Sequence, residues 1–230
     1  MTNDKADTPH AVVTGVSSGI GEAIARRLLE TGWHVTGLSR RKPAIDAPAF
    51  RHREADLSSE SSILAAAEGL AGTAFVHAAG LMSTNPLGML EPSAGMAMWQ
   101  VHVHAATLLA DRLLPGMDDG GRIVLIGSRT ATGAAGRSQY AATKAAFTGL
   151  ARSWAAELAP RGITVNIVSP AATDTPMLAD PARQSSAPRV PPIGRLIRPE
   201  EVAATVAFLL SADAAAITGQ NIVICGGSSL

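Results

Sequence analysis

Three side chains in the sequence have types and spacing that suit proton transfer. Tyr140 and Lys144 stand four residues apart, and Ser128 lies twelve residues before the tyrosine. The run Ser138–Leu158 is predicted to be helical, and residues at i and i+4 of a helix share one face, with side-chain bases about 5–6 Å apart. An ammonium beside a phenol favours the phenolate and lowers the phenol pKa from its reference value of about 10 toward neutral pH. The pair is therefore suited to general acid–base catalysis.

Ser128 follows a short apolar run, residues 121–127, which is typical of a β-strand. A serine at the end of that strand would lie beside the helix that carries Tyr140. The Tyr-x-x-x-Lys pattern alone is weak, because many helices contain it by chance. It gains weight in combination with a second motif near the N-terminus.

The second motif is a glycine-rich turn between an apolar strand, residues 11–14, and an amphipathic helix that ends at Gly32. Gly15, Gly19 and Gly21 fall at a set spacing in this turn. Glycines let a backbone approach a pyrophosphate, and a helix N-terminus offers unpaired N–H groups and the positive end of its dipole. The context favours a dinucleotide site over an ordinary tight strand-to-helix turn.

Together, the two motifs resemble those of the short-chain dehydrogenase/reductase family, and the resemblance covers nearly the whole chain. Ser128, Tyr140 and Lys144 match the family's catalytic positions. Four further segments carry the resemblance: Thr14-Gly15-x-x-x-Gly19-x-Gly21 in the cofactor turn, His77-Ala78-Ala79-Gly80 where the family commonly has Asn-Asn-Ala-Gly, Ser169-Pro170-Ala171 through Thr175, and residues 219–227 at the last strand.

The resemblance implies a nicotinamide dinucleotide cofactor. Lys144 would hold the nicotinamide ribose, Thr175 would bond the carboxamide, and Asp56 would contact the adenine ring. Asp56 is alternatively only the carboxylate at the N-terminus of the next helix. The predicted cofactor-binding residues are Gly15, Ser17, Ile20, Gly21, Ser39, Arg40, Asp56, Leu57, Ala79, Gly80, Tyr140, Lys144 and Thr175.

The end of the second predicted strand, residues 34–39, bears on the choice of cofactor. A carboxylate there would bind the adenosine 2′-hydroxyl and repel a 2′-phosphate. The chain instead has Ser39, followed by Arg40, Arg41 and Lys42, and a guanidinium makes forked, charge-assisted bonds to phosphate. NADP(H) is therefore favoured. NAD(H) stays open, because the same basic residues can form a solvated turn.

Strand-like and helix-like runs alternate along the chain, which predicts an α/β fold: a Rossmann-like, doubly wound parallel sheet of about seven strands with helices on both faces. A single catalytic domain is expected to span residues 1–230. The predicted strands are 11–14, 34–39, 50–55, 74–77, 122–127, 164–169 and 221–225. The predicted helices are 19–31, 59–69, 95–114, 138–158 and 199–210.

Two proline-containing segments break this alternation. Residues 40–49 have little helical period, so a full helix between the second and third strands is not expected. Residues 178–198 contain four prolines and mixed polarity, and are predicted to form a loop with at most one helical turn. Such a loop is either a surface excursion or a cover over a substrate, and the resemblance favours the cover.

Two histidines stand where the resembling family usually has asparagine. His77 replaces one that braces the carboxyl edge of the sheet, so local hydrogen bonding must differ there. His102 replaces one whose backbone carbonyl holds a water in a proton relay to the lysine. His102, a candidate catalytic residue, either keeps that backbone role, adds an ionisable group to the relay, or only packs. The histidines show no metal-ligand spacing, and no metal site is predicted.

The composition narrows the classes of function. The chain has 230 residues, 47% of them hydrophobic, and a formal net charge of zero. These values suit one α/β core and argue against a nucleic-acid groove or an anionic membrane surface. No apolar stretch approaches the roughly 20 residues that cross a bilayer. The single Cys225 excludes an intrachain disulfide and is expected to be buried and inert, so a cytoplasmic location is predicted.

The sequence thus predicts an NADP(H)-dependent carbonyl reductase or alcohol dehydrogenase that acts on a small-molecule carbonyl or alcohol. Imine reduction, epimerisation and a non-enzymatic dinucleotide-binding regulator stay open as alternatives. Arg129 either meets an anionic substrate or braces its loop. By resemblance, helices 95–114 and 138–158 pair subunits into a homodimer or homotetramer, with small residues allowing close approach: Ala141, Ala142, Ala145 and Ala146.

Overall fold

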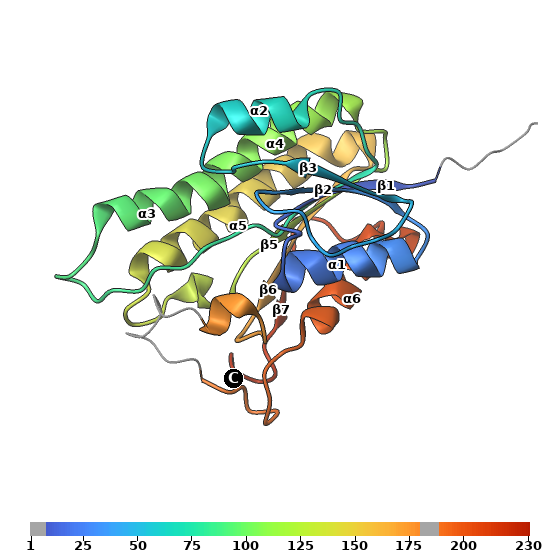
Figure 1. The fold of residues 1–230 in the computed structure, drawn as a ribbon. Coiled ribbons are helices and arrows are strands. Elements are labelled where there is room, and N and C mark those ends of the chain that lie inside the picture. The colour runs from blue at the N-terminus through green and yellow to red at the C-terminus, as the bar shows by residue number, and fades with distance from the viewer. Residues whose placement is uncertain (1–7, 180–188) are drawn as a thin grey trace, which may run out of the picture.

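A seven-stranded parallel sheet forms the centre of the computed structural model, which describes residues 8–179 and 189–230 (Figure 1). The strand order is β3-β2-β1-β4-β5-β6-β7, and every neighbouring pair runs parallel. The predicted doubly wound α/β fold is therefore confirmed. The strands are β1 His10–Thr14, β2 His34–Ser39, β3 Phe50–Glu54, β4 Ala74–His77, β5 Arg122–Ile126, β6 Thr164–Pro170 and β7 Asn221–Ile224.

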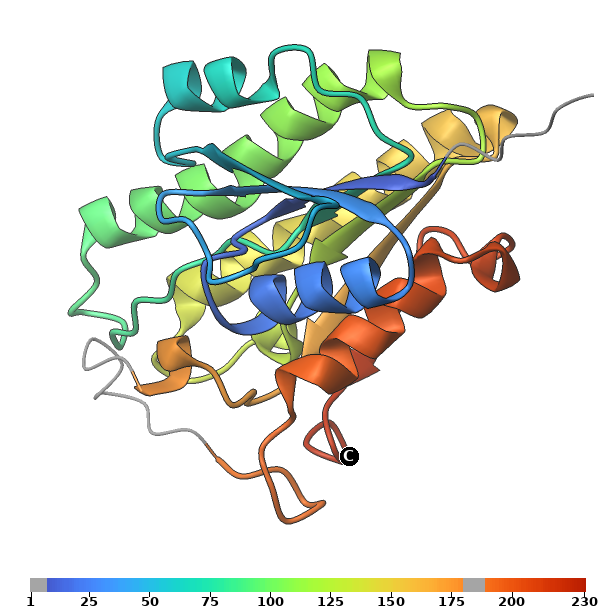
Figure 2. The same cartoon turned by 45° about the vertical axis from the view of Figure 1, so that its right-hand side comes forward.

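Helices cover both faces of the sheet (Figures 1 and 2). The first and last helices pack against each other on one face, and α2, α4 and α5 lie on the other. As expected, the segment between β2 and β3 contains no helix in residues 40–49. The helices are α1 Gly19–Glu30, α2 Glu60–Ala67, α3 Pro92–Trp99, α4 Ala105–Leu113, α5 Ser138–Leu158 and α6 Pro199–Leu210.

The central strands are buried on both faces because each face carries its own core. Along β1, Val12 packs with Phe75 in the core beneath α2, α4 and α5. Its neighbours Ala11 and Val13 pack in the core beneath α1 and α6. Successive side chains of a strand point to opposite faces. This two-sided burial explains why residues 123–126 of β5 are apolar without alternation.

The order of strands reverses between β1 and β4, which are neighbours in the sheet. From β1 the chain adds β2 and β3 on one side of the sheet, and from β4 it adds β5, β6 and β7 on the other side. At this point Thr14 and His77 pair as the last residues of their strands. Ligands of doubly wound folds bind outside the carboxyl ends of the strands at such a switch point. The fold therefore indicates where the site lies.

The helix predicted at residues 95–114 starts earlier and is interrupted. Pro92, in the first turn of α3, supplies a φ suited to a helix start and needs no N–H partner there. Between α3 and α4 the backbone forms a π-helical turn, Gln100–His104, which contains His102. Sequence periodicity did not indicate this turn. Such turns are rare and occur often at functional sites.

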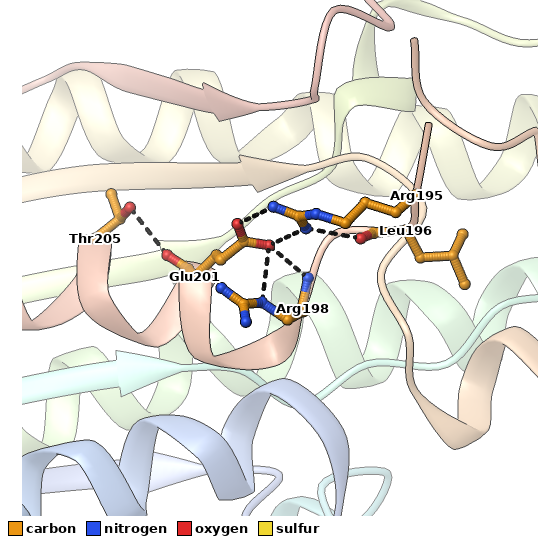
Figure 3. Close-up of polar contacts among 5 residues, drawn as sticks. All are labelled: Arg195, Leu196, Arg198, Glu201 and Thr205. Atoms are coloured by element: carbon orange, nitrogen blue, oxygen red, sulfur yellow. Dashed lines mark hydrogen bonds and ion pairs between the residues drawn. The ribbon is translucent and has the colours of Figure 1, made fainter. Parts of the chain in front are cut away.

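The predicted covering loop, residues 178–198, is described only in part, because residues 180–188 lie outside the described ranges. A short 3-10 helix, Pro176–Ala179, runs into its first residues. Its far end is tied to α6 through Glu201 (Figure 3). Both carboxylate oxygens accept from the Arg195 guanidinium at 2.7 Å, and one also accepts from the Arg198 N–H at 2.8 Å. These bonds hold the pKa of Glu201 down to about 2 and fix the chain entering α6 without a hydroxyl cap.

The expectation that Cys225 is buried was wrong. The strand β7 ends at Ile224, so Cys225 falls in the turn that follows, and its side chain is only partly covered. The strand β7 is also the edge strand of the sheet, so a neighbouring strand bonds to it on one side only. A hydrogen bond from the Ser229 side chain lowers the pKa of the Cys225 thiol.

Candidate active site

Two adjoining clefts open at the carboxyl edge of the sheet. The first has a volume of about 770 Å³ and is lined by Ser128, Tyr140 and Lys144 together with the end of β6. The second has a volume of about 460 Å³ and is lined by the glycine-rich turn after β1 and the end of β2. Six residues line both clefts, which therefore form one continuous groove: Ile20, Ala78, Gly80, Leu81, Thr175 and Met177.

The three proposed catalytic side chains reach the first cleft from two elements. Ser128 lies two residues after β5 and begins a 3-10 turn, where its Oγ lies 2.8 Å from Thr130 Oγ1. Tyr140 and Lys144 occupy successive turns of α5, and both are more than nine-tenths buried. The fold thus brings together residues that the sequence places on a strand end and on a helix.

Lys144 is held in an apolar setting with no carboxylate partner among the described residues. Its Nζ donates to the Ile126 carbonyl at 2.8 Å and lies 4.8 Å from the centre of the Phe147 ring. Burial disfavours the charged ammonium and lowers the Lys144 pKa to about 7. The lysine can therefore exchange its proton in the neutral range.

The glycine-rich turn has room for backbone only. Gly15 has a positive φ of 74°, and a Cβ there would lie 2.8 Å from the Ala79 Cα. A Cβ on Gly21 would lie 2.3 Å from the Gly15 carbonyl oxygen. The first glycine permits the tight turn, and the second permits close packing of α1 on β1. The turn therefore has the features of a cradle for a dinucleotide.

The second cleft gathers the predicted cofactor residues from four separate parts of the chain. These parts are the turn after β1, the end of β2, the segment after β3 and the segment after β4. One further residue of the cleft, Thr175, follows β6. Those lining this cleft are Gly15, Ser17, Ile20, Gly21, Ser39, Arg40, Asp56, Leu57, Ala79, Gly80 and Thr175.

Ser39 braces the basic turn that follows β2. Its hydroxyl donates to the Arg41 carbonyl at 2.7 Å, and the His52 ring lies 3.0 Å from the Ser39 carbonyl. Arg40 and Arg41 are exposed and line the cleft. The sequence did not indicate His52 as a brace, because it lies thirteen residues away on the neighbouring strand.

Asp56 fits both interpretations of its role. Its Oδ1 accepts hydrogen bonds from the Ser58 hydroxyl at 2.7 Å and from the Ser58 N–H at 3.0 Å, and these bonds lower the pKa of its carboxyl. The residue therefore fixes the turn before α2. It also lines the second cleft, so its local bonds leave it beside the predicted adenine position.

His77 is fully buried and joins the cofactor turn to the π-helical turn. Its Nδ1 lies 3.1 Å from Thr14 Oγ1, and its Nε2 lies 3.1 Å from the Val101 carbonyl. Because a carbonyl only accepts, the proton is assigned to Nε2, and Thr14 donates to Nδ1. Thr14 Oγ1 accepts in turn from the N–H groups of Ala78 and Ala79 at 3.0 Å. Burial lowers the His77 pKa to about 3, so the ring is neutral.

His102 makes a second link in the same region. Its Nε2 accepts from the Leu81 N–H at 3.0 Å, and its Nδ1 lies 2.8 Å from Thr143 Oγ1, which donates to the Tyr140 carbonyl at 2.9 Å. The ring also packs edge-on against Tyr140, with 5.7 Å between ring centres. Burial, and secondly the charge of Lys144, hold its pKa well below the usual value. The sequence did not indicate Thr143, although its place beside Lys144 on α5 was a usable signal.

Comparison with known proteins identifies the family of this chain. A family model described as enoyl-(acyl carrier protein) reductase matches residues 15–229. The 3-oxoacyl-(acyl-carrier-protein) reductase FabG of Vibrio cholerae is 34% identical over 234 residues, which cover 94% of this chain and 96% of the relative. The chain belongs to the short-chain dehydrogenase/reductase family. A second member, the cis-4-hydroxycyclohexanecarboxylate dehydrogenase of Sinomonas cyclohexanicum, is 37% identical over 237 residues, which cover 94% of this chain and 95% of the relative.

Solved structures of family members superimpose on nearly the whole chain. The 3-ketoacyl-(acyl-carrier-protein) reductase of Brucella melitensis, complexed with NADH, is 29% identical, covers 96% of this chain and 98% of its own, and has a TM-score of 0.87. A blue fluorescent protein from a metagenomic library, in complex with NADPH, is 30% identical, with the same coverage and a TM-score of 0.85. This short-chain dehydrogenase/reductase is therefore an NAD(P)-dependent oxidoreductase.

The described residues contain neither a metal cluster nor a membrane-spanning helix. In residues 8–179 and 189–230, no three His, Cys, Asp or Glu side chains gather so that they could hold a metal ion. Over the same ranges, no helix combines the length and the apolar character that crossing a bilayer requires.

Proposed function

We propose that this short-chain dehydrogenase/reductase interconverts a small-molecule carbonyl compound and its alcohol, with Tyr140 as proton donor and acceptor. The observation that carries the proposal is the continuous groove, in which the Ser128, Tyr140 and Lys144 cleft meets the glycine-rich turn. Ser128 and Tyr140 donate hydrogen bonds to the substrate oxygen, and Tyr140 transfers the proton. The Lys144 ammonium stabilises the phenolate that remains.

The cradle at Gly15 and Gly21 fits a nicotinamide dinucleotide, because a Cβ at either position would clash with neighbouring backbone and open the tight turn that lines the second cleft. When bound, the cofactor supplies or accepts the hydride at the substrate carbon. On the chain's side, α1 offers its N-terminal N–H groups to the phosphates. Lys144 holds the nicotinamide ribose, and Thr175 bonds the carboxamide from the point where the two clefts meet.

NADP(H) is the proposed cofactor. The residue that ends β2 is Ser39, so the cleft lacks a carboxylate at the position that would repel a 2′-phosphate. The Ser39 hydroxyl instead braces the turn that presents Arg40 and Arg41. Relatives bind both forms, since the metagenomic protein holds NADPH and the Brucella reductase holds NADH. The exposed guanidiniums of this chain favour the phosphorylated one.

His102 is proposed to position Tyr140 rather than to carry protons. Both ring nitrogens are engaged, and the low pKa keeps the ring neutral. Its bonds connect Leu81, in the segment after β4, to Thr143 on α5, one turn from the catalytic tyrosine. The ring therefore fixes the distance between the groove wall and the helix that carries Tyr140 and Lys144. His77 supports the same arrangement by holding the carbonyl of Val101.

Residues 1–230 are proposed to form one catalytic domain that assembles into a homodimer or homotetramer. On α5, Ala142, Ala145 and Gly149 are exposed at helical spacing, whereas the predicted interface residue Ala141 is buried in its own subunit. A row of small exposed side chains permits close approach of a second helix. Exposed Phe208 on α6 and Val223 on the edge strand give a second apolar face. A cytoplasmic location is also proposed, on the basis of a single cysteine with no disulfide partner.

Substitution of Tyr140 by phenylalanine tests the proposed chemistry. Tyr140 is the chain's single tyrosine, and removal of its hydroxyl removes the proton donor while keeping the buried ring. Turnover of ketones and aldehydes with NADPH should fall by about 10²–10⁴-fold. NADPH binding, measured by fluorescence titration, should stay within a few-fold of wild type and serves as the control for folding. A variant with near wild-type kcat would contradict the assignment.

A further inference from the structure

Arg129, the residue directly after Ser128, is a cation whose side chain has no partner in the described part of the chain. Its Nε is buried and makes no hydrogen bond, and its guanidinium has no hydrogen bond or ion pair with any described residue. Two other arginines of the chain have partners. Arg53, on β3, donates to the Ala66 carbonyl of α2 at 3.1 Å, while Arg161 pairs with Asp119 at 2.7 Å. Bracing of the loop therefore does not account for Arg129.

The described lining of the cleft around Arg129 is rich in basic side chains. Its described lining includes four basic side chains, Arg129, Arg137, Lys144 and Arg189, and no Asp or Glu side chain. Glu201, which anchors the far end of the covering loop, is already engaged by Arg195 and Arg198 (Figure 3). A cleft lined by charges of one sign concentrates ligands of the opposite sign.

Arginine in a partly buried position is normally paired, because an unsatisfied donor and a desolvated charge both carry a free-energy penalty. A guanidinium matches the geometry of an oxyanion through two parallel hydrogen bonds. An unpaired arginine beside the serine that holds the substrate oxygen is therefore suited to a second, negatively charged group on the same molecule.

We propose that the substrate of this enzyme carries an oxyanion, a carboxylate or a phosphate, and that Arg129 binds it. The inference rests on the proposed carbonyl chemistry and specifies its substrate class. The oxyanion lies a few bonds from the reacting carbonyl, because Arg129 is adjacent to Ser128 in the chain. Arg137 and Arg189 add to the positive potential of the cleft, and its apolar wall at Leu81 and Met82 contacts the carbon skeleton.

Matched substrates and matched variants test the proposal. The substrates are keto acids of increasing length between carbonyl and carboxylate, their methyl esters, and keto phosphates. The variants are Arg129→Ala and Arg129→Lys, with Arg51→Ala as control, because Arg51 is an exposed arginine outside both clefts. Steady-state kcat/KM with saturating NADPH is measured for every pair.

Wild type should prefer at least one charged substrate over its neutral ester. Arg129→Ala should lower kcat/KM for the charged substrate by about 10- to 100-fold, the effect of losing charge-assisted hydrogen bonds. The kcat/KM of Arg129→Ala for the ester should stay within about threefold of the wild-type value. Arg129→Lys should recover part of the loss, since it restores the charge without the fork. Arg51→Ala should match wild type. A preference for keto acids or for keto phosphates tells which oxyanion is bound.

Several results would overturn the proposal. The proposal would be overturned if the wild type reduced the neutral esters as well as, or better than, every charged analogue. That result would leave the proposed carbonyl chemistry valid. Equal losses for acid and ester in Arg129→Ala would also overturn the proposal, since they would indicate a general effect on the site. If Arg129→Ala does not fold, the wild-type preference and Arg129→Lys still decide. Binding of NADPH without turnover of any carbonyl compound would instead contradict the proposed function.

Discussion

Replacement of Lys144 by methionine should make the ligand-free enzyme more stable while it removes turnover. The ammonium lies in an apolar setting, where its pKa falls from 10.5 to about 7. That fall means that the folded state resists protonation of this group and the unfolded state does not. Methionine has a similar volume and carries no charge, so it avoids the penalty. Its cost is the lost hydrogen bond from Nζ to the Ile126 carbonyl.

The size of the effect follows from the two pKa values. One pH unit of pKa difference corresponds to 1.36 kcal/mol, so at pH 7 the penalty amounts to about 4 kcal/mol. A hydrogen bond from a charged donor is worth about 1.5–3 kcal/mol. The net gain of Lys144→Met at pH 7 is therefore about 1–3 kcal/mol in the free energy of unfolding.

The sign of the pH dependence is also fixed. Between pH 7 and pH 10.5 the unfolded state binds more protons at Lys144 than the folded state, so the stability of the wild type rises with pH across this window and is lost as pH falls through it. The contribution amounts to about 2 kcal/mol between pH 7 and pH 9. The variant lacks this contribution, so its advantage over wild type should shrink toward pH 9.

Urea unfolding of the ligand-free protein at pH 7 and pH 9, at one fixed protein concentration, measures both effects. Lys42→Met is the matched control, because Lys42 is exposed and lies outside both clefts. It should change stability by less than about 0.5 kcal/mol. The reasoning would be refuted by a Lys144→Met protein less stable than wild type at pH 7. Equal pH dependence in the two proteins would refute it as well.

Three other perturbations address the cofactor, the buried histidine and the assembly. Arg40→Ala should weaken NADPH binding by about 10- to 100-fold and leave NADH nearly unchanged in fluorescence titrations, with high salt reproducing part of the loss; a wild type that binds NADH more tightly would contradict this. The wild type should lose stability between pH 6.5 and pH 3, because the buried neutral ring of His77, with its pKa of about 3, takes up a proton on unfolding. His77→Asn should lessen this loss, and parallel acid-unfolding curves for the two proteins would argue against the reasoning. Sedimentation should show a dimer or tetramer that Ala142→Arg on α5 disrupts, whereas a 23.5 kDa species alone at micromolar concentration would exclude the assembly.

The features that the sequence predicted follow from local rules. The glycine spacing before α1 identified the turn because only glycine fits at Gly15 and Gly21. Helical periodicity put Tyr140 and Lys144 on one face of α5. Alternating strand and helix patterns then implied parallel strands, whose carboxyl ends must meet at one edge. Each of these steps needs only residue types and short separations along the chain, so the sequence was sufficient to predict both motifs and the edge of the sheet where they meet.

What the sequence did not reveal depends on long-range contacts and on the register of a helix. The π-helical turn Gln100–His104 shifts backbone bonds by one residue, and the periodicity of this segment did not indicate it. The brace from His52 to Ser39 crosses between strands, and the bond from His102 to Thr143 spans 41 residues. When only the sequence is known, a histidine at such a position has several plausible roles. Its hydrogen-bond partners decide among them.

The two histidines and the lysine together limit where protons can move. His77, His102 and Lys144 form a buried group of bases, and the charge of Lys144 helps to keep both rings neutral. Each ring already uses one nitrogen as a donor and the other as an acceptor, so neither can take up a proton without breaking a buried hydrogen bond. This agrees with the proposal that Tyr140 and Lys144 are the groups that transfer protons near pH 7. On the proposed chemistry, the histidines that stand in place of asparagine serve as rigid neutral supports, and His102 is not a proton carrier.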